Sequence, residues 1–199
     1  MSQAIVISIL RECTDLLWIA VMIIFTVGAL RTKRTVQSQS VRSVLVQSGF
    51  VALGLYLLFA ARVMLGGPDT WFDRPIIPVN VETVLVGFLA VLCGIAFTVW
   101  GRLTLGSNWS GVITLKEDHT LVRRGPYRIV RHPIYTGLLL ALLGSALERG
   151  RVGSMLGVVV CGFGLWLKSR TEERFMVQRF GDQYLRYRRE VKGLVPFLF

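Results

Sequence analysis

Residues 134–167 read IYTGLLLALLGSALERGRVGSMLGVVVCGFGLWL. Two apolar runs, residues 134–147 and 152–167, stand on either side of the polar turn ERGR at residues 148–151. As helices the runs would be about 21 Å and 24 Å long, which is short against the roughly 30 Å hydrocarbon core of a bilayer. The pattern therefore predicts a short helical hairpin that barely spans the hydrocarbon core or crosses it with little tilt.

The second run of the hairpin carries small residues at Gly153, Gly157 and Cys161, four positions apart. Small residues at this spacing let membrane helices approach one another closely. Glycine is also frequent in membrane helices in general. The spacing alone therefore leaves open whether these three residues form a packing face.

Three further apolar segments precede the hairpin, and each suits a membrane-spanning helix. They are residues 16–30, which extend upstream through Cys13 and Thr14, residues 44–65 and residues 79–100. Residues 5–10 fit either an interfacial turn or an extension of the first helix. Together with the hairpin, these segments predict about five transmembrane helices.

The composition agrees with a membrane protein. Hydrophobic residues make up 53% of the 199 residues, charged residues make up 18%, and the mean hydropathy is +0.56. A soluble domain usually carries about 25% charged residues, and a disordered chain has low hydrophobicity, so most proteins of both classes are excluded. We therefore expect an all-α integral membrane protein whose last two helices are the short hairpin.

The net charge of +11 is unevenly distributed. Residues 1–101 hold seven Lys/Arg and five Asp/Glu, whereas residues 102–199 hold sixteen and seven. Basic residues gather in the first loop, in the third loop at 101–133 and in the C-terminal tail, so the positive-inside rule places the N-terminus outside and the C-terminus in the cytoplasm. In so apolar a chain the charge favours an anionic bilayer surface over nucleic acid as partner. We divide the chain into a three-helix anchor, residues 1–103, and a region 104–199 that carries the polar chemistry.

The third loop, which enters the hairpin, is the first place where we expect chemistry. It contains LGSNW at residues 105–109, HTLV at 119–122 and GPYRIVRHPIYTG at 125–137. Pro133 disfavours helical geometry at His132 and suits the first turn of a helix, so Arg131 and His132 should sit where the loop enters the hairpin. The chain shows no HExxH or Cys/His metal motif and no glycine-rich nucleotide motif. The basic loop could also be a solvated, lipid-facing surface without a catalytic role.

The tail brings two adjacent carboxylates, Glu172 and Glu173, about one helical turn past the expected membrane boundary. Lys168 lies four residues before Glu172 on the same helix face, so the two could form an ordinary ion pair worth roughly a few tenths of a kcal/mol. Alternatively, one Glu turns back into the mouth of the helices to meet a cationic or hydroxyl-bearing ligand. The aromatic and basic residues that follow are typical of an interfacial amphipathic segment, which Gly181 interrupts.

Taken together, these residues resemble the isoprenylcysteine carboxyl methyltransferase family, including its small prokaryotic members. The shared elements, in the family's order and approximate spacing over residues 105–196, are LGSNW, HTLV, GPY, RHPIY with Gly137, the Glu pair, Phe180-Gly181, Tyr184, Tyr187 and Pro196. Each element is weak alone, but the ordered set is specific. The spans before residue 105 match the family only in hydropathy.

The resemblance implies a methyltransferase that binds S-adenosylmethionine without a Rossmann domain, between the cytoplasmic loop, the hairpin and the tail. The cofactor-binding residues that it implies are His119, Thr120, Leu121, Val122, Tyr127, His132, Pro133, Ile134, Tyr135, Glu172 and Glu173. Arg131 is expected to take part in catalysis or to brace one Glu, with Asn108 and Trp109 on the acceptor side. The substrate is expected to meet Lys168, which stands at a position where Arg is more usual in the family, and Arg170 is the alternative.

A carboxylate acceptor suits such a site, because a carboxyl group with a pKa of about 4 is already ionised and needs no general base. We expect a lipidic or prenylated acceptor that enters from the bilayer, most simply an isoprenylated cysteine, with phospholipid amines still open. No metal or nucleic acid is expected, and the oligomeric state stays open. Two other hypotheses are an NADPH-dependent enzyme like the sterol reductases, which share a similar C-terminal motif but are much longer, and a non-catalytic scaffold or transporter.

Overall fold

The computed structural model describes residues 2–29, 35–60, 70–109, 111–116 and 120–194. The predicted cofactor ligand His119 and the motif residue Pro196 lie outside these residues. In chain order the elements are α1 (Gln3–Ala29), β1 (Thr35–Ser38), α2 (Val41–Phe59), η1 (Trp71–Asp73), α4 (Val81–Leu105), η2 (Gly106–Asn108), β2 (Thr114–Lys116), η3 (Gly125–Arg128), α5 (Pro133–Arg149), α6 (Val152–Phe180) and α7 (Asp182–Glu190).

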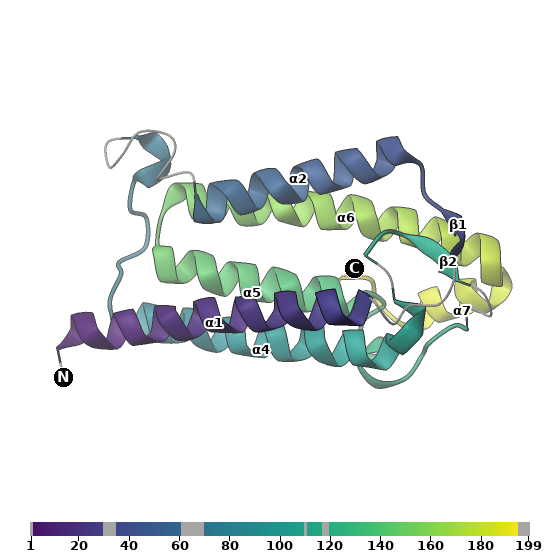
Figure 1. Ribbon diagram of the computed structural model, residues 1–199, viewed down its shortest axis with the longest axis horizontal. Helices are drawn as coiled ribbons and strands as arrows, with labels where there is room; N and C mark the ends of the chain where they lie inside the picture. Colours follow the sequence, from purple (N-terminus) through teal and green to yellow (C-terminus); the bar gives the residue numbers. More distant parts are fainter. Residues whose placement is uncertain (1, 30–34, 61–69, 110, 117–119, 195–199) are drawn as a thin grey trace.

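The long helices α1, α2, α4, α5 and α6 lie side by side along the length of the molecule (Figure 1). α4 and α5 pack along each other and α1 covers α4, while α2 packs along α6. The predicted hairpin is confirmed, since only residues 150–151 separate α5 from α6. Its two arms nevertheless pack chiefly on different partners, so each arm is held by a helix of the anchor region.

Small residues set the close spacing within both helix pairs. A methyl group at Gly94 of α4 would lie 2.5 Å from the carbonyl oxygen of Gly137 in α5, and one at Gly54 of α2 would lie 2.6 Å from that of Gly157 in α6. Cys161 approaches the same glycine of α2. The four-residue spacing in the second arm is therefore a packing face of the kind that small residues permit, with Gly157 and Cys161 close to α2 and Gly153 close to Phe72 of η1.

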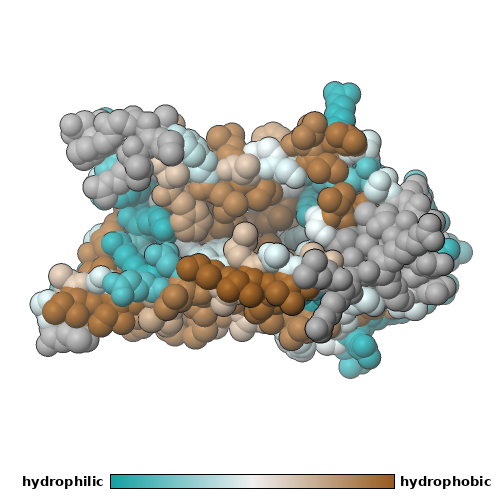
Figure 2. Space-filling view, viewed as in Figure 1, coloured by the Kyte–Doolittle hydropathy of each residue, from teal (hydrophilic) through white to brown (hydrophobic). Residues whose placement is uncertain are grey.

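Among the described helices, four are long and apolar enough to cross a membrane, namely α1, α2, α4 with its extension to Asn108, and α6. The 17 residues of α5 span about 25 Å, so this arm is short, as predicted. α1 begins at Gln3, so residues 5–10 extend the first helix. α6 continues past the apolar run and carries the Glu pair beyond it. Figure 2 shows hydrophobic surface along the bundle, in brown.

Two short strands are an addition that the sequence did not predict. β1 pairs antiparallel with β2, with Thr35 opposite Lys116, and the amide of Gln39 donates to the carbonyl of Ile113 over 3.0 Å. Strands of four and three residues are too short to show an alternating pattern. The ribbon joins the first and third loops near α7 (Figure 1), so the two basic loops lie at the same end of the helices.

Candidate functional site

A cavity opens at the α7 end of the molecule, where the third loop meets the first turn of α5, the outer part of α6 and α7. The predicted site residues that line it are Asn108, Trp109, Thr120, Leu121, Val122, Tyr127, Arg131, His132, Ile134, Tyr135 and Glu172. The structure thus brings most of the predicted residues to one place, although they come from separate segments of the chain.

The first turn of α5 is fixed from two sides. Pro133 occupies its first position, and His132 precedes it with a non-helical backbone (φ −123°, ψ 61°), as is typical before a proline. Residues 192–194 run beside this segment. The amides of Arg131 and His132 donate to their carbonyls over 2.8 and 3.2 Å, and the hydroxyl of Thr136 donates to the same segment over 2.6 Å. The tail therefore positions the polar end of α5.

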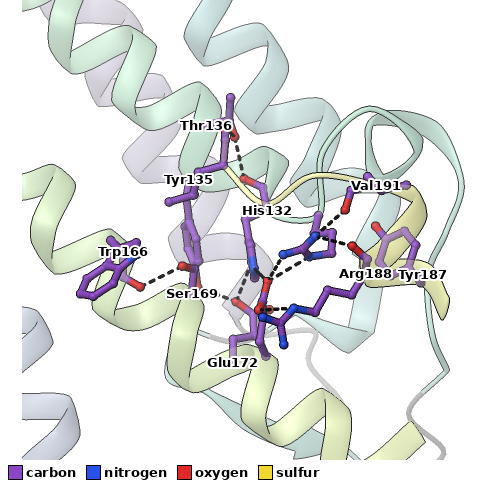
Figure 3. Close-up of polar contacts among 12 residues, drawn as sticks. His132, Tyr135, Thr136, Trp166, Ser169, Glu172, Tyr187, Arg188 and Val191 are labelled. Atoms are coloured by element: carbon purple, nitrogen blue, oxygen red, sulfur yellow. Dashed lines mark hydrogen bonds and ion pairs between the residues drawn. The ribbon is translucent and has the colours of Figure 1, made fainter. Parts of the chain in front are cut away.

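Glu172 reaches from α6 toward the first turn of α5 (Figure 3). Its Oε2 accepts a hydrogen bond of 2.9 Å from the Tyr135 hydroxyl and lies 3.4 Å from Nδ1 of His132. The rings of His132 and Tyr135 stack, with centroids 5.5 Å apart. The ammonium of Lys168 donates instead to the carbonyl of Gly111 over 2.8 Å. Glu172 therefore turns into the mouth of the helices, which is the second of the two alternatives for the tail.

Glu173 has a different environment, is only 6% exposed and does not line the cavity. Its Oε1 accepts hydrogen bonds from Nε and Nη2 of Arg131 over 2.9 and 2.5 Å and lies 3.3 Å from Nε2 of His132. Its Oε2 is 3.5 Å from Nε of Arg188 in α7. Arg131 also donates to the backbone carbonyls of Arg188 and Val191 (Figure 3). Arg131 therefore braces Glu173 and connects it to the tail.

His132 is buried between the two carboxylates. Burial lowers the pKa of an imidazole, but the hydrogen bonds and charges of Glu172 and Glu173 together outweigh this effect and raise the pKa of His132 above its ordinary value. When protonated, both ring nitrogens donate, one toward each carboxylate. The two carboxylates therefore hold the imidazole ring in one orientation. The stacked His132 ring in turn restricts the position of the Tyr135 ring.

The aromatic wall of the cavity is held by α7. Tyr187 donates its hydroxyl to the carbonyl of Tyr127 over 2.6 Å, and the rings of Tyr184 and Tyr187 meet edge to face with centroids 5.9 Å apart. Burial is the largest cause that raises the pKa of all three phenols. They therefore stay neutral at physiological pH and act as apolar faces with a polar tip.

Asn108 and Trp109 line the cavity where α4 ends. The side-chain amide of Asn108 donates to the hydroxyl of Thr120 over 3.3 Å, while its Oδ1 is buried and has no partner among the residues that the structure describes. The ring of Trp109 meets Phe25 of α1 edge to face at 5.2 Å and lies 4.3 Å from the guanidinium of Arg102. These two contacts fix the indole, and the amide oxygen can accept a hydrogen bond from a ligand.

Several predicted residues are absent from the cavity wall. Pro133 is fully buried, Glu173 is held by Arg131, and Lys168 bonds to the third loop, with its ammonium 5.7 Å from the centroid of the Tyr135 ring. Arg170 is exposed on α6 and does not line the cavity.

The cavity also has lining residues that were not among the predicted site residues. These are Leu105, Val112, Ile113, Met176, Tyr184 and Tyr187. Met176 lies four residues after Glu172 and so shares its helix face, which is a signal that the sequence contained. The loop residues Val112 and Ile113 follow no helix or strand period, so no pattern marked them.

Comparisons with known proteins place this chain among methyltransferases. The family model for phospholipid methyltransferase matches residues 83–183. The protein-S-isoprenylcysteine O-methyltransferase of Schizosaccharomyces pombe is 30% identical over 123 residues, which cover 59% of this chain and 50% of that protein. The protein of the same name from Homo sapiens is 31% identical over 124 residues, which cover 57% and 41%. The chain spans about half the length of the curated relatives that it matches.

The names of these relatives confirm the resemblance that the sequence elements indicated. The matched residues 83–183 contain α5, α6 and almost all of α4, together with the third loop, and therefore include most of the cavity wall. Because the family model covers just over half of the 199 residues, this protein belongs to the phospholipid methyltransferase family.

Proposed function

We propose that this protein transfers the methyl group of S-adenosylmethionine to a carboxylate on a lipidic acceptor, and that this acceptor is an isoprenylated cysteine. The observation that carries the proposal is the cavity at the α7 end, where the carboxylate of Glu172, aromatic rings and a buried amide oxygen meet beside membrane helices. The names of the relatives support the choice of acceptor.

The cavity residues fit S-adenosylmethionine. Glu172 offers a carboxylate to the ammonium or the ribose hydroxyls of the cofactor, and Tyr127 and Tyr135 offer aromatic faces to its adenine. Within the described part of the chain, Oδ1 of Asn108 is a buried acceptor that still lacks a donor, and a bound ligand would satisfy it. Residues 120–122 complete this wall.

When bound, S-adenosylmethionine supplies a methyl group on a positively charged sulfur. The residues of the chain contribute alignment and the exclusion of water, which are the main requirements of an in-line displacement. Glu172 and His132 hold the polar part of the ligand, while Asn108 and Trp109 cover the acceptor side. Arg131 acts through Glu173 as a positioning residue, because its guanidinium is engaged by that carboxylate and by backbone carbonyls.

The protonation of His132 and Tyr127 in the cavity favours a carboxylate acceptor over an amine. An ammonium group must lose a proton before it can attack, whereas a carboxylate is already ionised. Glu172 and Glu173 outweigh burial and raise the pKa of His132, which favours the protonated imidazole, and burial raises the pKa of Tyr127, which favours the neutral phenol. A protonated imidazole and a neutral phenol are poor bases. The family's description names phospholipids, so a phospholipid amine is the second candidate acceptor.

The proposal includes five membrane crossings, with the N-terminus outside and the C-terminus in the cytoplasm. The crossings are α1, α2, α4, α5 and α6. The arrangement of the loops supports this topology, because the ribbon and the cavity lie at one end of the helices while η1 and the turn at residues 150–151 lie at the other. The cofactor would then enter from the cytoplasm and the acceptor from the bilayer.

Calorimetric titration of the purified protein in detergent tests the choice of cofactor. S-adenosylmethionine and S-adenosylhomocysteine should bind and NADPH should not. Glu172→Gln should weaken binding of S-adenosylhomocysteine about tenfold, which is the order of one hydrogen bond to a charged group. Glu190→Gln, which removes a carboxylate from the exposed pair with Arg123, should leave the affinity unchanged. A folded protein that binds neither adenosyl ligand would refute the proposal.

The acceptor is tested with a labelled methyl donor and two substrates in parallel, a prenylated cysteine and phosphatidylethanolamine. Transfer to the prenylated cysteine should produce a methyl ester, which base hydrolyses to volatile labelled methanol. Transfer to an amine would give a product that base leaves intact. Label found only in the base-stable form would replace the carboxylate with the amine acceptor.

A further inference from the structure

A second cavity lies at the opposite end of the helices from the cofactor cavity. It is lined by residues from α1, the end of α2, the η1 region and the α5–α6 turn, among them Arg11, Asp15, Leu57, Val79, Glu148 and Arg149. Figure 2 shows hydrophilic surface at this end, beside the hydrophobic flank of the bundle. The length of α5, about 25 Å, separates the two cavities, so this one takes no part in methyl transfer.

In the described parts of the chain, the hydrogen bonds of two guanidinium groups in this cavity go to backbone carbonyls. Arg11 donates to the carbonyl of Glu148, and Arg149 donates to the carbonyl of Ser145 over 3.0 Å. Neither is within 4.0 Å of a carboxylate oxygen in the described parts of the chain, whereas Arg151 pairs with Asp73 at 2.5 Å. Nε of Arg11 is buried without a described partner. Because a guanidinium has five N–H donors, both side chains retain donors for an anion.

Glu148 and Asp15 act electrostatically on Arg149, but in the described parts of the chain neither carboxylate is bonded to Arg11 or Arg149, so N–H donors of both guanidinium groups stay available. The carboxylate of Glu148 is 1% exposed and accepts a hydrogen bond of 2.7 Å from Thr14. Asp15 is exposed, and it lies four residues after Arg11, on the same face of α1. The cavity therefore presents an anion site at Arg11 and Arg149, with one accessible carboxylate, Asp15, beside it. These charges are complementary to a phosphate joined to an ammonium group.

The surroundings place this charge pattern at the level of a bilayer headgroup. Trp71 of η1 is 54% exposed at this end of the molecule, and the guanidinium of Arg149 lies 4.5 Å from the centroid of the Phe59 ring. Aromatic residues gather at the membrane–water interface. Leu57 and Val79 supply apolar wall next to the charged groups, where acyl chains would continue into the bilayer.

We propose that this cavity binds a zwitterionic phospholipid with a primary ammonium headgroup. Arg11 and Arg149 bind its phosphate, Asp15 binds its ammonium, and its acyl chains lie along the apolar wall. Guanidinium groups suit this role because they donate paired hydrogen bonds to phosphate oxygens. The lipid would be a structural partner that ties α1 to the α5–α6 turn.

Thermal unfolding of the delipidated protein in a non-ionic detergent tests this site with dihexanoyl phosphatidylethanolamine as probe. We expect a saturable rise in the unfolding temperature. Dihexanoyl glycerol, which lacks the headgroup, and inorganic phosphate, which lacks the chains, should give little or none. The phosphatidylcholine of the same chain length should bind more weakly, because a trimethylated ammonium donates no hydrogen bond to Asp15. An equal response to dihexanoyl glycerol or to inorganic phosphate would overturn the proposal.

Variants locate the binding. Arg149→Gln and Arg11→Gln should each raise the apparent Kd about tenfold, the order of one charge-assisted hydrogen bond. Arg179→Gln removes an exposed arginine at the other end of α6 and should bind as the parent does. Asp15→Asn changes an exposed side chain, so it should fold even if an arginine variant does not, and it should abolish the preference for ethanolamine over choline. A preference that survives Asp15→Asn, or an unchanged affinity in Arg149→Gln, would overturn the proposal.

Discussion

Replacing Glu173 by Gln removes the charge at the centre of the network that supports the cavity at the α7 end. The side chains of Arg131 and Glu173 are only 9% and 8% exposed, and one carboxylate oxygen receives two N–H groups of the guanidinium. Breaking a buried ion pair on one side leaves the other charge uncompensated, which costs about 3–5 kcal/mol. For a chain of this size such a loss lowers the unfolding temperature by roughly 6–20 °C, as differential scanning fluorimetry in detergent would measure.

The matched control is Glu190→Gln. Glu190 pairs with Arg123 by the same chemistry, but those side chains are 57% and 40% exposed, and exposed pairs contribute about 0–1 kcal/mol. The double variant Arg131→Met with Glu173→Leu removes both charges and should be less destabilised than Glu173→Gln. If Glu173→Gln unfolds within 2–3 °C of Glu190→Gln, a difference of about 1 kcal/mol, the burial argument is refuted.

Three further outcomes are expected. Because the pKa of His132 is raised in the folded state, its contribution to stability is fully present below the unfolded value of about 6.5 and is lost as the pH rises through the folded value; a His132→Asn protein should lack this loss in unfolding experiments from pH 6 upward. Gly94→Ala places a methyl group 2.5 Å from the backbone of α5 and should lower the free energy of unfolding by about 1–3 kcal/mol. In the control Gly49→Ala the methyl group meets nothing within 4 Å, so this variant should not be destabilised. Equal unfolding temperatures for the two variants would contradict the packing account. Tyr187→Phe removes the hydrogen bond to the carbonyl of Tyr127 and should cost about 1 kcal/mol and weaken S-adenosylhomocysteine binding; unchanged values of both would show that α7 does not hold this wall.

The hairpin was predictable because its signals are local, whereas the cavity residues were predicted from the family resemblance. Polar residues at 148–151 between two apolar runs indicate a turn, and Pro133 after His132 marks the start of a helix. The order of the motifs then placed loop and tail residues in one site. Adjacent residues on a helix point about 100° apart, so Glu172 and Glu173 were bound to have different surroundings. The sequence alone does not indicate which of them faces the cavity.

The remaining features depend on contacts between distant segments that no period encodes. Gly157 and Cys161 could have packed on either neighbouring helix, and only the assembled bundle shows that they meet α2. The β1–β2 ribbon is too short to leave a pattern, and the role of Arg131 as a brace depends on where residues 188–191 return. The position of Arg170, exposed and outside the cavity wall, was likewise invisible in its spacing from Glu172.

The hydrogen bonds between residues 192–194 and the start of α5 set an order on the synthesis of this protein. α4 and α5 can pack as soon as both have left the ribosome, since their contacts need no later segment. The polar end of α5 gains its partners only after α6, α7 and the residues beyond them have been made. A chain truncated within α7 would therefore keep the five long helices, yet lack the residues that hold Arg131 and His132 in place.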